Sequence, residues 1–371
     1  MRARLRLRLL CGLLGFCAVF ALAAESKPKK LIEFGWDEPS TSFMREHIGE
    51  MERAPFDGVV FNAEGRKPRG SKRRFTWEAW TTNRFEEIEM QPAIDDLRAT
   101  KFQRFADNFL RFNTTPAKLD WFDDYSAVIH NCRIAAWTAK QGGVKGLLFD
   151  IEQYEGQLFD YRKQRDNETK TWDVYAAKVR ERGREVMNAF QDGYPDATIF
   201  LTFGYSLPWN QSQQGKRPLA ECSYGLLAPF LDGMLDAAKG KTILVDGNEG
   251  AYRFKDTNRF ATSYRAMKEE LLPIVRADRM TYAKHFSSSF GLWMDCDWRK
   301  VGWETNDFSN NFYTPEVFES SLRTALQTTD EYVWVYTEQP RWWSAEGKMV
   351  KMPEAYERAV RQARKGLAKD W

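Results

Sequence analysis

The sequence predicts a single (β/α)8 barrel, a TIM barrel of the α/β class, from three observations. Strand-like apolar segments alternate with helical segments along the chain, which is typical of βαβ units around a parallel sheet. Eight such segments are apolar on both faces, as strands covered on both sides should be. No Gly-x-Gly-x-x-Gly follows the first of them, which disfavours an open dinucleotide-binding sheet.

The expected elements follow one another in a single series. The strands span residues 31–37, 56–62, 104–113, 146–152, 198–205, 242–249, 290–297 and 331–338. The helices between them span residues 41–54, 124–141, 172–192, 255–276, 315–328 and 354–367. Extended loops, residues 63–85 and 153–170, follow the second and fourth strands and therefore belong to the mouth of the barrel. Long loops in a compact domain are usually functional.

Residues 1–24 have the pattern of a secretory signal peptide. A basic start, "MRARLRLR", precedes an apolar stretch and a small-x-small site at residues 21–23. We therefore expect residues 25–371 to form the barrel, secreted or periplasmic, with no membrane segment after cleavage. Cleavage would remove four of the 55 basic residues and leave 51 against 52 acidic residues. This balance provides no basic field for nucleic acid.

The cysteines and histidines do not form a metal or redox motif. Cys132, Cys222 and Cys296 would remain in the mature chain, an odd number without C-x-x-C spacing. We expect them to be small buried residues. We expect no cofactor and no catalytic metal. A structural calcium ion stays an open alternative, because clusters of Asp and Asn could hold one, although no EF-hand spacing is present.

Polar side chains, most of them acidic, end every expected strand. They are Asp37, Asn62, Asn113, Asp150 with Glu152, Tyr205, Asp246 with Glu249, Asp295 with Asp297, and Glu338. The active site of a (β/α)8 barrel lies at the C-terminal ends of its strands. Asp and Asn also favour turns, which explains one or two of these residues but not the whole ring.

A ring of carboxyl groups with aromatic side chains and few cations suits glycoside hydrolysis. That reaction needs a protonated carboxyl group for the leaving oxygen and a second carboxylate. Crowded acids raise one another's pKa, which keeps one of them protonated. Leu148, Asp150 and Glu152 share one face of the fourth strand. We predict Glu152 as the general acid and Asp150 as the residue that orients it.

The second carboxylate is not fixed by the sequence. Glu338 and Asp246 are the two main candidates, with Glu249 and Asp295 behind them. We also expect a set of substrate-binding residues at the strand ends and in the loops that follow: Trp36, Asp37, Asn113, Tyr205, Trp209, Glu249, Trp293, Asp295 and Trp342. The basic residues 65–74, followed by "WEAW" at 77–80, form either a solvated loop or a site for anionic groups on a polysaccharide.

Residues 146–152, "GLLFDIE", resemble the strand-4 motif of glycoside hydrolase family 18, the chitinases. In that family the last Glu of Asp-x-Asp-x-Glu is the acid, and the preceding Asp assists an acetamido group of the substrate. The resemblance implies these roles for Glu152 and Asp150 in a barrel glycosidase. The chain departs from the motif at Leu148, which replaces the first Asp. It also departs in the sixth strand, where residues 246–249 replace the Met-x-Tyr of the family.

Two other functions fit parts of the pattern. A carbohydrate-binding barrel would keep the aromatic side chains at the mouth and would not need two carboxyl groups within reaction distance. A polysaccharide lyase would use a base such as Tyr205 or His285 near a cation. A zinc hydrolase and a serine hydrolase are disfavoured, because neither His-Glu-x-x-His nor Gly-x-Ser-x-Gly occurs.

Overall fold

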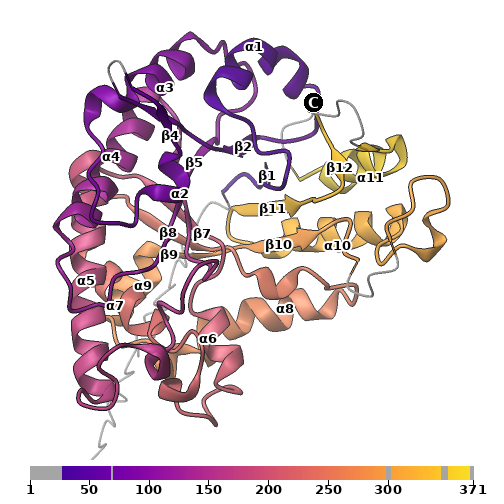
Figure 1. Cartoon of the computed structure of the whole chain (residues 1–371). Helices are drawn as coiled ribbons and strands as arrows, with labels where there is room; N and C mark the ends of the chain where they lie inside the picture. The colour runs from indigo at the N-terminus through magenta and orange to yellow at the C-terminus, as the bar shows by residue number, and fades with distance from the viewer. Residues whose placement is uncertain (1–26, 68–69, 298–301, 344–349, 368–371) are drawn as a thin grey trace, which may run out of the picture.

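The computed structural model describes residues 27–67, 70–297, 302–343 and 350–367, and the expected signal peptide, residues 1–24, lies outside them. A parallel sheet forms a nearly closed barrel, with its strands in the centre and helices around them (Figure 1). The strands, in the order in which they neighbour one another, are β10 (Phe290–Trp293), β11 (Tyr332–Tyr336), β1 (Lys30–Glu33), β2 (Gly58–Phe61), β5 (Phe109–Asn113), β6 (Gly146–Asp150), β7 (Thr198–Leu201), β8 (Ile243–Asp246) and β9 (Phe286–Ser288).

All eight predicted strands are present, and the seventh is interrupted. Its two parts, β9 and β10, are separated by Ser289, and β9 lies before the predicted range 290–297 and was not predicted. The first part pairs with β8 and the second with β11, so that together they fill one position of the ring. The (β/α)8 prediction is therefore confirmed.

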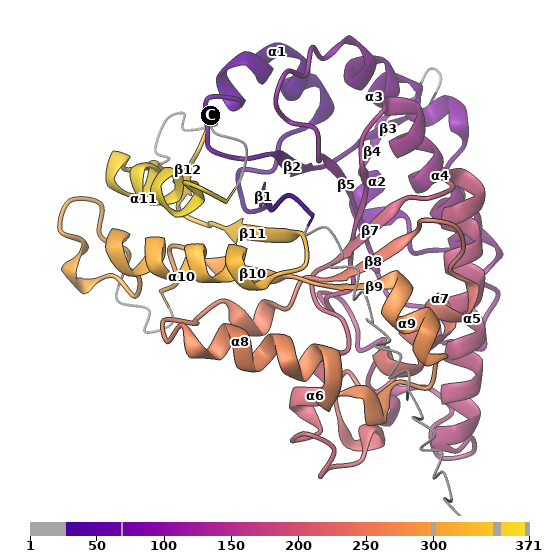
Figure 2. The same cartoon turned by 180° about the vertical axis from the view of Figure 1, so that it is seen from behind.

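Helices cover the outside of the barrel, as the views from both sides show (Figures 1 and 2). They are α1 (Thr41–Met51), α3 (Glu87–Ala99), α4 (Ser126–Gly142), α5 (Trp172–Gly193), α7 (Leu227–Ala237), α8 (Asn258–Arg265), α9 (Arg279–His285), α10 (Pro315–Thr328) and α11 (Glu354–Arg364). Each of the six predicted helical segments contains one of them. The segment 255–276 differs, because α8 continues as a π-helical turn at 266–270 and a 3-10 turn at 272–274.

Three of these helices were not predicted, for identifiable reasons. Almost all of α7 is buried, and its sequence contains Pro229 and Gly233, two residues that disfavour a helix. Pro92 lies inside α3, and a proline usually indicates the end of a helix. α9 has only seven residues, which is too short for a clear helical pattern. α5 and α7 also approach closely through glycine: a Cβ on Gly183 would lie 2.1 Å from the Phe230 carbonyl oxygen.

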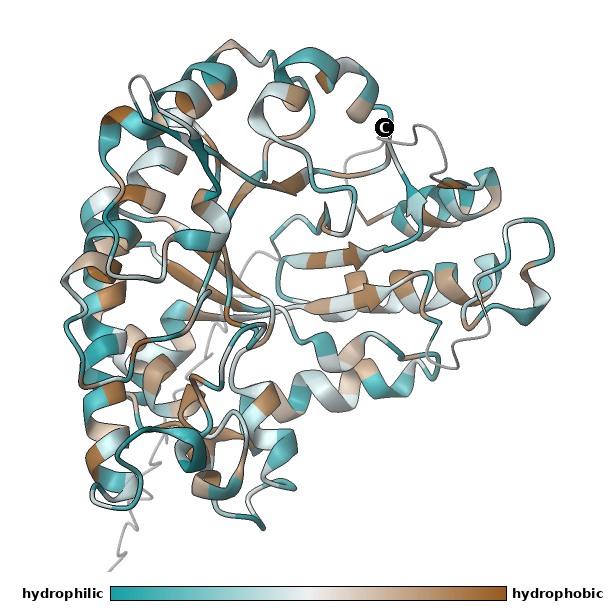
Figure 3. Ribbon diagram, viewed as in Figure 1, coloured by the Kyte–Doolittle hydropathy of each residue, from teal (hydrophilic) through white to brown (hydrophobic). Residues whose placement is uncertain are grey.

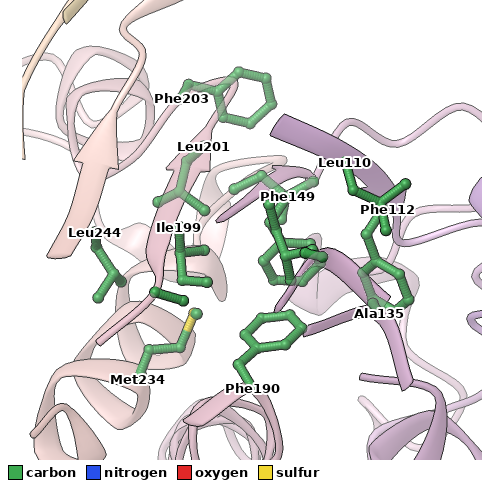
Figure 4. Packing of buried hydrophobic residues seen from close by; sticks show 14 of the residues in the cluster. Leu110, Phe112, Ala135, Phe149, Phe190, Ile199, Leu201, Phe203, Met234 and Leu244 are labelled. Atoms are coloured by element: carbon green, nitrogen blue, oxygen red, sulfur yellow. The ribbon is translucent and has the colours of Figure 1, made fainter. Parts of the chain in front are cut away.

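The strands separate two apolar cores by the alternation of their side chains. Inside the barrel lie Ile32, Phe34, Val60, Phe109, Leu148, Phe200, Val245, Tyr332 and Trp334. Between the strands and the helices, outward side chains such as Phe149 and Ile199 pack with Phe190 of α5 and Met234 of α7 (Figure 4). Colouring by hydropathy shows apolar strands within helices of mixed, one-sided character (Figure 3). In β6, Leu148 faces inward and Phe149 outward, as predicted.

The loops after β2 and β6 rise from the same end of the barrel. The first contains a two-stranded antiparallel pair, β3 (Gly65–Arg66) with β4 (Lys72–Arg73), and the short helix α2 (Phe75–Glu78). The second contains a 3-10 turn, Tyr161–Lys163. Since both follow the C-terminal ends of strands, they border the site described below.

One buried carboxyl group, Glu33 of β1, has no hydrogen-bond partner among the residues that the structure describes. Its side chain is fully buried. Burial, followed by the charges of Asp37 and Glu38, raises the pKa of Glu33 well above its ordinary value. A carboxyl group whose pKa is higher in the folded protein favours folding at low pH, and that contribution is lost as the pH rises.

We therefore expect Glu33→Gln to become more stable relative to the parent protein as the pH rises from 4.5 to 8. The relative gain should be at least about 1.4 kcal/mol, the equivalent of one pKa unit. Urea denaturation at both pH values measures it. The exposed Glu155→Gln is the control and should show no such change. A pH-independent difference for Glu33→Gln would contradict the prediction.

Candidate active site

A cleft at the C-terminal ends of the strands consists of two adjoining cavities. The first has a volume of about 580 Å³ and lies against the ends of β7 and β8. The second has a volume of about 700 Å³ and lies against β1, β5, β6, β10 and β11. Three residues line both cavities: Glu152, Glu249 and Tyr252. The centre of the cleft is thus occupied by two carboxyl groups and a phenol.

The two carboxyl groups come from neighbouring parts of the barrel mouth. Glu152 lies two residues beyond Asp150, the last residue of β6, and its backbone N–H donates to Asp150 Oδ1 at 3.1 Å. Glu249 begins a 3-10 turn after β8, and Asn248 before it has a left-handed backbone with φ of 44°. The Tyr252 hydroxyl donates to Glu249 Oε1 at 3.1 Å.

Each of these carboxyl groups titrates in the field of the other charges of the site. Burial, followed by the charges of Glu152 and Asp150, raises the pKa of Glu249 well above its ordinary value. Burial, followed by the charge of Asp150, also raises the pKa of Glu152. Tyr154 and Arg111 oppose the second shift. The charge of Glu152 therefore acts on Glu249 across the cleft.

A buried ion-pair network lies directly behind Glu152. Arg111 of β5 donates from Nη2 to Asp150 Oδ2 at 2.6 Å and from Nη1 to Glu38 Oε2 at 3.0 Å. Its Nε donates to Asn113 Oδ1 at 3.1 Å. The Tyr154 hydroxyl donates to Asp150 Oδ2 at 3.0 Å. Asp150 is fully buried, so its oxygens are used to hold this end of β6 in place.

Aromatic side chains line the second cavity. Trp36 is 64% exposed, and its Nε1 donates to the Tyr336 hydroxyl at 2.9 Å. That hydroxyl donates to Glu338 Oε1 at 3.1 Å. Tyr252 stacks on Tyr336 with 5.6 Å between ring centroids. Ligand pockets are usually lined by apolar ring faces together with a few polar groups that can hydrogen-bond to the ligand.

Five of the predicted site residues line this cleft. They are Glu152 and Glu338 of the predicted catalytic set and Trp36, Glu249 and Trp293 of the predicted binding set. Glu338 is partly buried, and burial raises its pKa. Its carboxyl group belongs to the aromatic side of the cleft, against Tyr336.

Five others lie behind the cleft and fix its shape. Asp246 is fully buried and accepts from the backbone N–H groups of Gly204, Ser206 and Asn248 and from the Ser206 hydroxyl. Asp295 accepts from the backbone N–H groups of Glu338 and Gln339. Asp37 accepts from those of Trp342 and Trp343. Asn113 and Asp150 belong to the Arg111 network described above.

The remaining three predicted binding residues lie in the apolar packing of the fold. Tyr205 is fully buried and donates to Asp232 Oδ1 at 2.7 Å. Trp209 is buried in the outer core. Trp342 packs edge-on against Phe56 with 4.7 Å between ring centroids. None of the three lines either cavity.

Part of the basic stretch after β2 pairs with nearby carboxylates. Lys72 pairs with Glu64 at 2.6 Å and Arg73 with Glu89 at 3.1 Å. Residues 68–69 of this stretch lie outside the described residues. Trp77, just beyond it, does line the cleft, and the Arg111 guanidinium lies 4.7 Å from its ring centroid.

Several residues of the cleft were not predicted. Arg111 is the most informative, because it is a charged residue within an apolar strand, with the spacing of two that puts it on the face of Phe109 and Asn113. Asn113 is paired in register with Asp150. A cation on that face therefore indicated a buried acid partner. Tyr252, Arg253 and Arg259 follow the turn after β8, and the sequence carried no motif for them.

The described residues provide neither a metal site nor a membrane-spanning helix. The described residues contain no group of three or more His, Cys, Asp or Glu arranged to hold a metal ion. Cys132, Cys222 and Cys296 are buried and unbonded, as predicted. Within the described ranges no helix has the length and hydropathy required to span a bilayer.

Comparison with known proteins finds solved structures of low sequence identity. No protein-family model matches the chain, and no curated protein matches its sequence. The similar solved structures include a broad-specificity GH5-4 endoglucanase from an uncultured bacterium, with 11% identity, coverage of 89% of this chain and 86% of that one, and a TM-score of 0.49. A Bacteroides ovatus GH5 xyloglucanase has 9% identity, coverage of 91% and 74%, and a TM-score of 0.49. These structures are glycoside hydrolases, and the function proposed next is derived from the cleft itself.

Proposed function

We propose that this chain is an exported glycoside hydrolase that cleaves a poly- or oligosaccharide with Glu152 and Glu249 as its reacting carboxyl groups. The observation that carries the proposal is the coupled pair: two partly buried carboxyl groups at the centre of one aromatic cleft, with the charge of Glu152 raising the pKa of Glu249. Glycoside hydrolysis requires two carboxyl groups that differ in protonation.

The environments of the two groups suggest how they divide the reaction. Glu249 has the more strongly raised pKa, although the hydrogen bond that Tyr252 donates to it opposes the shift, so it is the group that holds a proton. Glu152 lies beside Arg111, whose charge favours its ionised form. We therefore propose Glu249 as the general acid and Glu152 as the nucleophile or base. The sequence had predicted Glu152 as the general acid, so its proposed role is now different. Glu249 replaces Glu338 and Asp246, the main candidates from the sequence, as the second carboxyl group of the reaction.

Other residues would support this reaction. Asp150 and Arg111 hold the Glu152 turn, and Asp246 holds the turn that leads into Glu249 through Asn248. Trp36, Trp77 and Trp293 line the second cavity, where sugar rings would stack on them. The predicted lyase bases are poorly placed, because Tyr205 is buried against Asp232 and His285 against the Thr242 carbonyl oxygen.

A panel of polysaccharides tests the proposal. The purified protein is incubated with neutral, uronate-containing, sulfated and amino-sugar glycans, and released reducing ends are measured. We expect Glu152→Gln and Glu249→Gln each to abolish the release from the active substrate. Glu155→Gln, exposed in the loop after β6, is the matched control and should keep full activity.

Two outcomes would contradict the proposal. Hydrolysis that survives both glutamine substitutions would place the chemistry elsewhere. Glycan binding without hydrolysis by the parent protein would instead favour the carbohydrate-binding barrel.

A further inference from the structure

Arg253 and Arg259 are two cations on the wall of the first cavity, the one between the ends of β7 and β8. Both side chains are exposed. Among the residues that the structure describes, no carboxylate lies within ion-pair distance of either guanidinium. The other two arginines that line the cleft differ, because Arg111 pairs with Asp150 and Arg341 donates to the Glu338 carbonyl oxygen.

Aromatic rings hold the two free guanidinium groups. Arg259 lies over Phe254 at 4.1 Å from the ring centroid, and Arg253 lies over Trp293 at 6.0 Å. Stacking uses the face of a guanidinium and leaves the N–H donors at its edge available. The nearby Asp256 accepts instead from the backbone N–H of Asn258 at 3.0 Å. The two arginines are thus positioned without being neutralised.

The same cavity contains both carboxyl groups of the proposed reaction. Glu152 and Glu249 are its acidic lining residues, and Glu249 lies four residues before Arg253. A group bound by the arginines would therefore sit on a sugar that reaches the reacting carboxyl pair. Planar forks of N–H donors match the paired oxygens of carboxylates and sulfates. A neutral hydroxyl group would leave both positive charges uncompensated.

We propose, on the basis of the function proposed above, that Arg253 and Arg259 form a subsite for an anionic substituent of the substrate, a uronate carboxylate or a sulfate ester. The site recognises the negatively charged oxygens shared by both groups. The basic stretch after β2 was the alternative site for such a group, and two of its cations, Lys72 and Arg73, pair with Glu64 and Glu89 instead.

Binding to matched glycan pairs tests the subsite. Each pair has one backbone with and without its charge: a xylan oligosaccharide with and without methylglucuronate, and a carrageenan oligosaccharide with and without sulfate. Affinity is measured by calorimetry with the Glu152→Gln variant, which leaves the glycan intact. We expect at least one charged member to bind about tenfold more tightly than its neutral partner, and this preference to weaken with added salt.

Variants assign the preference to the two arginines. Arg253→Gln/Arg259→Gln should reduce it to less than about twofold without weakening the neutral partner. Arg265→Gln is the matched control on α8, since Arg265 pairs with Glu270 at 3.0 Å and does not line the cavity. The xylan and carrageenan pairs distinguish uronate from sulfate.

The outcomes separate this inference from the proposed function. No preference in any pair, or a preference that survives the double substitution, would overturn the subsite. Hydrolysis of a neutral glycan that depends on Glu152 would in that case leave the proposed function intact. A charged glycan that binds through the arginines but is not cleaved would support the subsite and contradict the hydrolase.

Discussion

Glu249→Gln should lower kcat on a natural glycan by about 10³-fold, the usual contribution of a general acid. On an aryl glycoside with an acidic phenol as leaving group, the same substitution should cost less than about tenfold, because that leaving group needs no proton. Glu152→Gln should abolish activity on both substrates, since a nucleophile or base is needed whatever the leaving group. Steady-state kinetics on the two substrates measures the difference.

The assignment of the two roles depends on this comparison. If the aryl glycoside rescues Glu152→Gln and not Glu249→Gln, the roles are the reverse, as the sequence predicted. Glu338→Gln is the matched control, because Glu338 lines the same cleft and its carboxyl group binds Tyr336. A loss for Glu338→Gln as large as for Glu249→Gln would contradict the choice of Glu249 over Glu338.

The charge coupling within the pair can be observed directly. The charge of Glu152 is the largest cause after burial for the raised pKa of Glu249. In Glu152→Gln that charge is absent, so we expect the pKa of Glu249 to fall towards its ordinary value. Carboxyl carbon chemical shifts followed through a pH titration by NMR measure it. An unchanged pKa would show that the two groups do not interact.

The sequence predicted the barrel well because each strand carries its own evidence. Eight apolar segments and the alternation in β6 were sufficient to place Leu148 in the barrel and Phe149 beneath the helices. The sequence did not predict β9, the part of the seventh strand before the break at Ser289, because its residues, Phe286–Ser288, are mostly polar. The local sequence pattern predicts whether a segment is a strand. The break at Ser289 depends instead on how the two parts pair, β9 with β8 and β10 with β11.

The second carboxyl group of the proposed reaction was harder to predict, because its identity depends on which way the side chains at the end of a strand face. Asp246 shares the outward face of β8 with Leu244, and Val245 points into the barrel. The two-residue period alone does not say which face is inward. Glu249 reaches the cleft only through the left-handed turn at Asn248. Asp246-Gly247-Asn248 has the composition of a turn, and Asp246 accepts from the Asn248 backbone N–H two residues on. That pattern does not say where the turn directs Glu249.

Arg111→Met should lower the free energy of unfolding by about 3–5 kcal/mol, the cost of leaving buried charges without a partner. Arg111 is 7% exposed and Asp150 is fully buried, and Glu38 would lose the same cation. Adding Asp150→Asn removes one uncompensated charge, so the double variant should recover about 2 kcal/mol. Urea denaturation of both variants measures these differences.

The double-variant comparison also shows how the network serves the site. Asp150 is held by Arg111 and in turn accepts from the backbone N–H of Glu152. Arg111→Lys keeps the charge but not the planar fork that joins Asp150 to Glu38, so it should retain most of the stability and still lower kcat by about tenfold. Loss of kcat with the fold retained is what a positioning residue predicts. A cost of less than about 1 kcal/mol for Arg111→Met would mean that the ion pair is not needed to hold the mouth of β6 together.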